Sequence, residues 1–208
     1  MTYKLIIFDF DGTLADSFPF VLSIIDQVAD KYKIKRIDQT EIDLLRDYDA
    51  RKVLKYLGIP LWKVPTIANY GLGLLAKEFD RLRLFEGIEA LLQTLSNQGI
   101  KLAIVTSNRY ENVYKVLGPQ NAALIDYYEC GASLFGKQSK LKKVLKKSGV
   151  RPDEAICIGD EIRDIEAAQK AKIPFGAVAW GYTKVEALQA CAPNEVFTSV
   201  AEMAEKIL

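Results

Sequence analysis

Two groups of aspartates could do chemistry in this chain, and each stands just after an apolar run. Asp9 and Asp11 follow one such run, and Asp160 and Asp164 follow another. Carboxylates brought together repel each other unless a cation lies between them. Hard oxygen ligands with no histidine or cysteine nearby favour Mg²⁺, which typically takes one or two carboxylates, several waters and a phosphate oxygen. The sequence therefore predicts a Mg²⁺ site that includes Asp9 and Asp160.

The same residues, together with a hydroxyl and a lysine, could carry out phosphoryl transfer. A carboxylate such as Asp9 can attack phosphorus and form an aspartyl phosphate, which divides one difficult displacement into two. Asp11 lies two residues on, on the same side of an extended chain, and can act as acid and base. The Thr106 hydroxyl and nearby backbone amides can donate to phosphate oxygens, and a lysine such as Lys137 can offset the charge on the transferring group. None of these roles needs histidine.

The composition excludes several other kinds of site. The 208 residues include 28 Lys and Arg and 27 Asp and Glu, and the net charge of +1 gives no general attraction to nucleic acid. The absence of histidine excludes Ser-His-Asp, Cys-His and His-ligated metal sites. The three cysteines lack CxxC spacing, and the first apolar run is too short for a signal peptide or membrane span. We therefore expect a cytoplasmic protein without nucleic-acid or membrane partners.

The positions of these side chains depend on the elements that precede them. Strands are predicted at 4–8, 101–106, 155–158 and 175–179. Helices are predicted between and after them, at 88–97, 111–117, 139–148, 164–171, 183–189 and 200–207. This alternation is typical of an open, Rossmann-like parallel sheet with helices on both faces. Because ligands bind beyond the carboxyl ends of such strands, the candidate residues should gather at one edge of the sheet.

An all-helical insertion is expected between the first strand and the rest of the sheet. It spans 17–84, contains no strand pattern and includes a further helix over 64–79. Its candidate N-caps are Ser17, Thr40 and Asp49. The predicted fold class is therefore α/β, with a core of residues 1–16 and 85–208 interrupted early by helices.

The first motifs resemble those of the haloacid dehalogenase-like hydrolase superfamily, in particular its phosphoglycolate-phosphatase-like members with a small helical cap. The resemblance covers essentially the whole chain. The run DFDGTL at 9–14 is similar to the first motif, which implies that Asp9 is nucleophile and metal ligand. It also implies that Asp11 is the general acid and base and gives a backbone carbonyl to the metal. Gly12 would adjoin the phosphate.

The remaining motifs are similar to those of the same family. The run AIVT, followed by Ser107 and Asn108, resembles the second motif, in which Thr106 holds the phosphate; the adjacent Ser107 is an alternative. Lys137 resembles the lysine of the third motif, although Gln138 follows it where many relatives have proline, and Lys140 competes for the role. The run GDEIRD resembles the fourth motif, which implies that Asp160 binds Mg²⁺. Glu161, where many relatives carry Ser or Thr, and Asp164 would support the metal.

The resemblance implies Mg²⁺-dependent hydrolysis of a small phosphorylated metabolite through an aspartyl phosphate, with phosphoglycolate as a candidate substrate. A sugar phosphomutase of the same superfamily and a catalytically silent binding protein on this fold are the alternatives. A metal-free dehalogenase would leave Asp11 without a role. Substrate choice would rest with the insertion, where the candidates are Arg46, Tyr48 and Arg51. Either arginine could pair with a substrate carboxylate or with a neighbouring aspartate at the surface.

Overall fold

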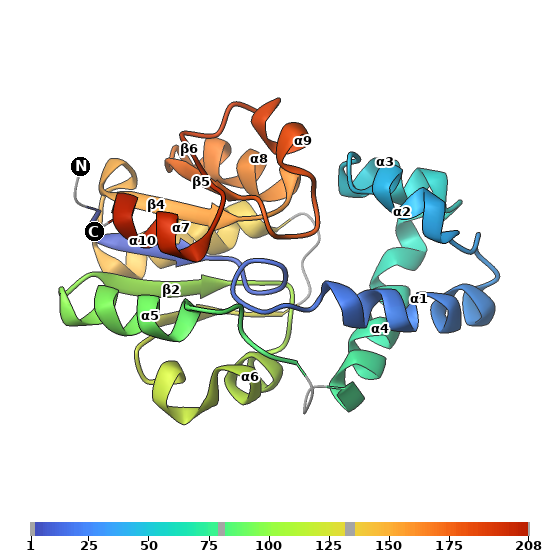
Figure 1. The fold of residues 1–208 in the computed structure, drawn as a ribbon, viewed down its shortest axis with the longest axis horizontal. Coiled ribbons are helices and arrows are strands. Elements are labelled where there is room, and N and C mark those ends of the chain that lie inside the picture. The colour runs from blue at the N-terminus through green and yellow to red at the C-terminus, as the bar shows by residue number, and fades with distance from the viewer. Residues whose placement is uncertain (1–2, 79–81, 132–135, 208) are drawn as a thin grey trace.

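The computed structural model describes residues 3–78, 82–131 and 136–207. Within these ranges a single parallel sheet runs in the order β3-β2-β1-β4-β5-β6, as the α/β alternation predicted. The strands are β1 (Leu5–Phe8), β2 (Lys101–Val105), β3 (Tyr127–Glu129), β4 (Ala155–Gly159), β5 (Phe175–Val178) and β6 (Glu195–Phe197). The α-helices of this part are α5 (Ile88–Asn97), α6 (Tyr110–Ala122), α7 (Lys137–Ser148), α8 (Ile162–Ala171), α9 (Val185–Gln189) and α10 (Val200–Ile207). Figure 1 shows them on both faces of the sheet.

The central strand β1 divides its side chains between two apolar layers. Leu5 and Ile7 pack with residues of α7, α8 and α9, whereas Ile6 and Phe8 pack with residues of α5, α6 and α10. All four side chains are fully buried, as expected for a strand covered on both faces. β1 pairs with β2 on one side and with β4 on the other. The three strands that carry the candidate motifs are therefore neighbours, and their carboxyl ends lie at the same edge.

The two edge strands, β3 and β6, were not predicted. Each has three residues, and neither shows an apolar run, because an edge strand is covered on fewer sides than a central one. α7 begins at Lys137, two residues before the predicted start, so this lysine lies in the first turn of a helix rather than in a loop. α6 continues past its predicted end across a break at Gly118, where φ is 71°.

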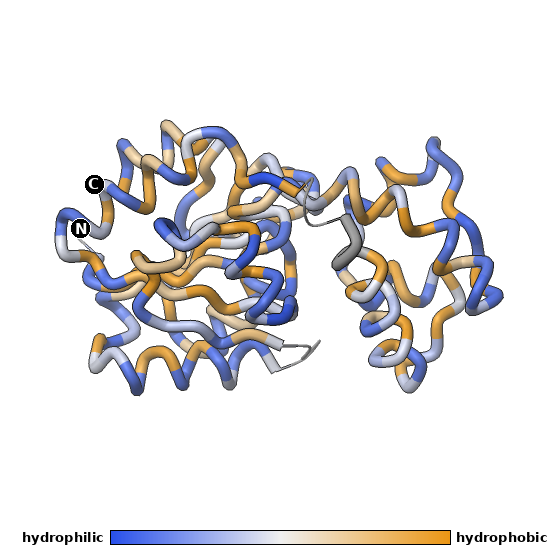
Figure 2. The backbone as a smooth tube through the Cα atoms, turned by 90° about the horizontal axis from the view of Figure 1, so that it is seen from below, coloured by the Kyte–Doolittle hydropathy of each residue, from blue (hydrophilic) through white to orange (hydrophobic). Residues whose placement is uncertain are grey.

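The insertion is helical, as expected, and has a small core of its own. It contains α1 (Phe18–Tyr32), α2 (Gln39–Leu45), α3 (Ala50–Tyr56), a 3₁₀ turn (Leu61–Lys63) and α4 (Val64–Glu78). Leu57, Ile59 and Val64 are buried together at its centre. Figure 2 shows the insertion beside the α/β part, in which hydrophobic stretches run through the middle. The predicted end of the last helix, Phe79, lies outside the described residues.

The helix starts of the insertion follow from capping chemistry. Asp49 accepts a hydrogen bond from Lys52 N at 2.9 Å and caps α3, as predicted. Thr40 was wrong as a cap, because Asp38 takes this position and forms a capping box with Glu41. Ser17 does stand at the N-cap position of α1, but its hydroxyl shares a 2.7 Å hydrogen bond with the Tyr182 hydroxyl of the core instead of capping the helix.

The chain enters and leaves the insertion through two segments that pair with each other. Phe85 N donates to Leu14 O, and Asp16 N donates to Arg83 O, both at 2.9 Å. The division into a core of 1–16 and 85–208 and an insertion of 17–84 remains our proposal, which this pairing supports. No helix in the described ranges is both long and apolar enough to cross a membrane.

Candidate functional site

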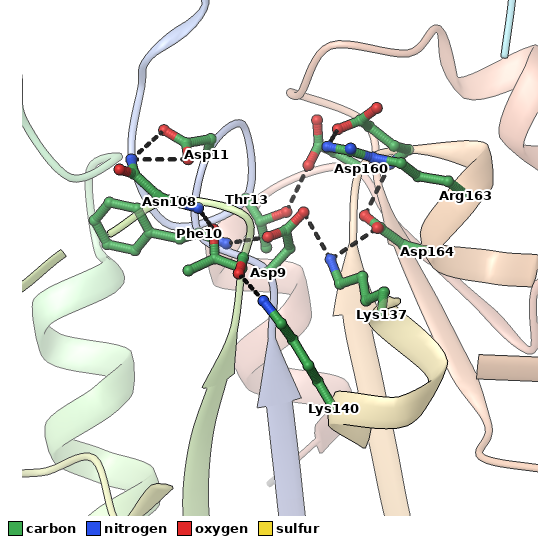
Figure 3. Close-up of polar contacts among 12 residues, drawn as sticks. Asp9, Phe10, Asp11, Thr13, Asn108, Lys137, Lys140, Asp160, Arg163 and Asp164 are labelled. Carbon is green, nitrogen blue, oxygen red and sulfur yellow. Dashed lines mark hydrogen bonds and ion pairs between the residues drawn. The ribbon is translucent and has the colours of Figure 1, made fainter. Parts of the chain in front are cut away.

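A cavity of about 420 Å³ opens between helix α3 of the insertion and the carboxyl ends of the sheet. Asp9 lies at its base, with Thr106 and Ser107 from the end of β2 and Lys137 from the start of α7. Figure 3 shows Asp160, which directly follows β4, and Asp164, in the first turn of α8, beside Asp9. The parallel register of three adjacent strands brings these residues together from positions more than 150 apart in the sequence.

Lys137 bridges two buried carboxylates. Its Nζ lies 2.8 Å from Asp9 Oδ2 and 2.7 Å from Asp164 Oδ1. Phe10 N donates to the other oxygen of Asp9 at 2.7 Å. Burial alone would raise the pKa of Asp9, but the charges of Lys137 and Arg163 outweigh it and hold this pKa below the ordinary value. Asp9 is therefore ionised, with one oxygen held by the backbone and the other beside an ammonium group.

The carboxylates of Asp9, Asp160 and Asp164 form a group that fits a divalent cation. One oxygen of each lies within 4.8 Å of the others, and all three residues are buried. Asp160 is fixed by hydrogen bonds from Thr13 Oγ1 and Tyr182 N, each at 2.8 Å. Burial, together with the negative charges of Glu161, Asp9 and Asp164, raises the pKa of Asp160 well above its ordinary value. A hard cation would relieve this repulsion, and an all-oxygen donor set suits Mg²⁺.

Asp160 packs against two glycines, at positions where any side chain would overlap it. A Cβ on Gly12 would lie 2.3 Å from Asp160 Oδ2, and a Cβ on Gly181 would lie 2.1 Å from Asp160 Cβ. Gly12 also has a φ of +75°, which disfavours any residue with a side chain. Gly12 therefore adjoins the carboxylate group directly. Gly181 was not among the predicted site residues, because only the folded loop after β5 brings it to Asp160.

Asp11 lies apart from the carboxylate group, on the side of β2. Asn108 Nδ2 donates to Asp11 Oδ2 at 3.1 Å, and Figure 3 shows this pair away from Lys137. Burial and the nearby negative charge of Asp9 raise the pKa of Asp11 to about 6. A carboxyl group with this pKa exchanges protons near neutral pH, which is what an acid and base requires.

The two candidate lysines have different positions. Lys137 contacts the carboxylates, whereas Lys140 Nζ donates to the backbone carbonyls of Thr106 at 2.7 Å and Gly131 at 2.6 Å. Lys140 thus holds the backbone at the end of β2. Thr106 is buried there, and its Oγ1 accepts a hydrogen bond from Asn108 N at 3.0 Å. Thr106 and Ser107 both line the cavity.

Arg163 is a site residue that the sequence reasoning missed. It lines the cavity and forms an ion pair with Glu161, the residue that departs from the usual motif. Its Nε is buried without a hydrogen-bond partner among the described residues. Although burial opposes the charged form, the charges of Glu161, Asp164 and Asp9 raise the pKa of Arg163, so it stays charged. The extra acidic residue at 161 was the available signal, because a partly buried carboxylate within an acidic group favours a counter-charge nearby.

The three candidate specificity residues of the insertion line two different cavities. Arg51 lines the 420 Å³ cavity, together with Lys52 and Lys55 of the same helix. Arg46 and Tyr48 instead line a second, mainly apolar cavity of about 380 Å³, which lies between the insertion and core residues such as Tyr182. The guanidinium of Arg46 donates to backbone carbonyls of the core rather than pointing at Asp9 (Nε to Tyr182 O, 3.0 Å).

Known proteins resemble this chain over nearly its whole length. The model of the haloacid dehalogenase-like hydrolase family matches residues 6–178. A phosphoglycolate phosphatase of Synechococcus elongatus is 29% identical over 203 residues, covering 97% of this chain and 96% of that protein. One from Vibrio vulnificus is 28% identical over 224 residues, covering 99% and 96%. The crystal structure of a predicted phosphatase from Clostridium acetobutylicum has a TM-score of 0.83 at 24% identity, covering 100% and 99%. The chain therefore belongs to the haloacid dehalogenase-like hydrolase family, as its motifs predicted.

Proposed function

We propose that this phosphatase-type hydrolase cleaves a small phosphomonoester with the help of Mg²⁺, through an aspartyl phosphate, and that phosphoglycolate is a candidate substrate. The observation that carries the proposal is the position of Asp9. Its ionised carboxylate lies at the base of a cavity, 2.8 Å from the Lys137 ammonium and in one group with Asp160 and Asp164. A carboxylate so placed can attack a phosphorus atom whose charge is shared by the surrounding cations.

In the first step, an oxygen of Asp9 forms a bond to phosphorus, and the bond from phosphorus to the ester oxygen breaks. The leaving oxygen takes the proton of Asp11, whose raised pKa of about 6 allows it to carry one. In the second step, ionised Asp11 accepts a proton from a water molecule that attacks phosphorus. Asp9 then leaves as a free carboxylate, and inorganic phosphate is released.

The other residues bind and orient. Lys137 would hold Asp9 in place and offset charge on the phosphoryl oxygens, while the hydroxyls of Thr106 and Ser107 would donate to those oxygens. Mg²⁺, held by Asp9, Asp160 and a backbone carbonyl of Asp11, with Asp164 and Glu161 in support, would neutralise part of the phosphate charge. The insertion would exclude bulk water from the closed cavity.

The cationic lining of the cavity supports a substrate with a second anionic group. Arg51, Lys52 and Lys55 of α3 line the cavity from the insertion. An arginine can bind a carboxylate through two parallel hydrogen bonds, as a phosphorylated carboxylic acid would require. Phosphoglycolate, the substrate in the names of the curated relatives, has this chemistry.

The test is phosphate release from p-nitrophenyl phosphate and from phosphoglycolate, with Mg²⁺ and after its removal by EDTA. We expect Asp9→Asn to lower kcat on the order of 10³-fold or more, because the amide cannot replace the nucleophile. Asp153→Asn is the matched control, since Asp153 is exposed and pairs with the nearby Arg151 at the surface. Equal activity of Asp9→Asn and wild type would overturn the mechanism. Isomerised sugar phosphate without net phosphate release would instead support a mutase.

A further inference from the structure

We propose that Arg46 is a positioning residue that couples docking of the insertion to Mg²⁺ binding at Asp160. It acts through residues 180–184, here called the 180–184 loop, which follow β5 and lie between the insertion and the carboxylate group. The inference rests on the proposed function only in taking Asp160 as a ligand of the metal.

On the core side, the 180–184 loop lies directly against Asp160. Tyr182 N donates to Asp160 Oδ2 at 2.8 Å, and the absence of a side chain on Gly181 allows its Cα to approach closely. Trp180 Nε1 donates to Thr13 O at 3.1 Å, and the Thr13 hydroxyl in turn donates to the other oxygen of Asp160. Both oxygens of Asp160 are thus held by groups that depend on the position of this loop.

On the side of the insertion, residues that follow α2 hold the same loop. Arg46 donates from Nε to Tyr182 O at 3.0 Å and from Nη2 to Gly181 O at 3.1 Å. Lys184 N donates back to Arg46 O at 3.0 Å. Lys184 Nζ also lies 3.3 Å from Asp47 Oδ2, in a more exposed ion pair. Arg46 therefore contacts the loop through both its side chain and its backbone.

The coupling follows from a single peptide group. Gly181 O and Tyr182 N belong to the same planar unit, so they cannot turn independently. Arg46 binds the carbonyl end of this unit, and Asp160 binds its amide end. A guanidinium at the carbonyl also polarises the N–H that points at Asp160, because hydrogen bonds in a chain strengthen one another. Release of Arg46 would free the peptide group to rotate and leave one oxygen of Asp160 without its donor.

Because coupling between two binding events is reciprocal, the docked insertion should favour Mg²⁺, and Mg²⁺ should favour docking. A residue that merely stabilised the insertion would not alter the affinity of the folded protein for Mg²⁺ alone. This difference separates a positioning role from a structural one.

The experiment is calorimetric titration of the whole protein with Mg²⁺ alone, in wild type, Arg46→Met and Arg46→Lys. We expect Arg46→Met to weaken Mg²⁺ binding about five- to tenfold, the lower part of the usual range for coupled sites. The Mg²⁺ affinity of Arg46→Lys should lie between those of wild type and Arg46→Met, because lysine keeps the positive charge but lacks the two separate donor nitrogens of arginine. With p-nitrophenyl phosphate as substrate, the KM for Mg²⁺ should rise, whereas kcat at saturating Mg²⁺ should fall less. Arg36→Met is the matched control, because Arg36 pairs with Asp30 on the exposed surface of the insertion.

Unchanged Mg²⁺ affinity in Arg46→Met would overturn the proposal, whatever happens to its thermal stability. If Arg46→Met does not fold, wild-type affinity in Arg46→Lys together with an unchanged KM for Mg²⁺ has the same consequence. A failure of the proposed function would show differently, because wild type itself would then release no phosphate. Wild type that hydrolyses esters and binds Mg²⁺, beside an Arg46→Met variant that binds it equally well, refutes the coupling alone.

Discussion

Removal of the Lys137 ammonium should lower the free energy of unfolding by several kcal/mol. It should also make this free energy depend more strongly on Mg²⁺. The lysine contacts Asp9 at 2.8 Å and Asp164 at 2.7 Å, and the exposed fractions of the three side chains are 13%, 5% and 0%. Loss of one member of such a buried pair costs about 3–5 kcal/mol, since the remaining charge stays buried without a partner. For Lys137→Met we therefore expect a free energy of unfolding lower by at least about 3 kcal/mol at pH 7.

The loss of stability in Lys137→Met should be smaller at acidic pH. In wild type the pKa of Asp9 is lowered, so this ionised group stabilises the fold above the ordinary aspartate pKa. Without Lys137, burial would raise the pKa of Asp9 above its value in the unfolded chain. The pKa of Asp164, which burial raises to about 7 even beside Lys137, would rise further. The two carboxyl groups would then take up protons on folding, and the difference between variant and wild type should be smaller at pH 5 than at pH 7.

Mg²⁺ should restore part of the stability. A ligand at one hundred times its Kd stabilises the folded state by about 2.7 kcal/mol. The variant should gain more from a given Mg²⁺ concentration than wild type, because Asp9, Asp160 and Asp164 no longer have a neighbouring ammonium. Urea unfolding at pH 5 and pH 7, with EDTA or with Mg²⁺, measures these effects. Lys170→Met is the control, since Lys170 is exposed and pairs weakly with Glu166 at 3.8 Å. A Lys137→Met variant no less stable than this control, and no more responsive to Mg²⁺, would refute the reasoning.

Two further variants test the roles of the first motif. Asp11 needs its proton to assist the leaving oxygen, so kcat/KM for an alkyl phosphate should fall as pH rises above about 6, where the protonated form is lost. Asp11→Asn should therefore lower kcat/KM, which reports the first step, far more for an alkyl phosphate than for p-nitrophenyl phosphate, whose leaving group needs no proton. Equal losses of kcat/KM on both substrates would contradict this role. Gly12→Ala should weaken Mg²⁺ binding measured by calorimetry, because its Cβ would lie 2.3 Å from Asp160 Oδ2 and its φ of +75° would be strained. Wild-type affinity in this variant, with an intact near-ultraviolet circular dichroism spectrum, would show that Asp160 can move without cost to the site.

The central part of the fold was predictable because its strands are buried on both faces. Runs such as 5–8 and 155–158 are apolar throughout, and only an interior strand of a parallel sheet requires this. β3 and β6 escaped prediction because each is short and lies at an edge, where half-covered residues leave no periodic pattern. The positions of Asp9, Asp11 and Asp160 followed from the strand ends alone, since parallel neighbours end at the same edge.

The parts of the site that depend on tertiary contacts were not predictable. Arg163 pairs with Glu161, two residues earlier, but its position near Asp9 appears only once α8 is packed on the sheet. Arg46 was a candidate to pair with a substrate carboxylate or with a neighbouring aspartate. Its guanidinium instead donates to the carbonyls of Gly181 and Tyr182, more than 130 residues away. No local sequence pattern encodes such a contact, because every residue carries a backbone carbonyl, whatever its side chain.

The paired segments at the base of the insertion have a consequence for how enzymes of this architecture can diversify. Backbone hydrogen bonds join Leu14 to Phe85 and Asp16 to Arg83, so the two ends of the insertion lie close together. The insertion therefore connects to the α/β part much as a short turn would. Each doubling of a closed loop costs only about 0.6 kcal/mol, so helical units of other sizes could be exchanged here with little effect on the α/β part. Substrate preference can then evolve apart from the phosphoryl chemistry. The contacts that Ser17, Arg46 and Asp47 make with the 180–184 loop would have to be rebuilt in each exchange.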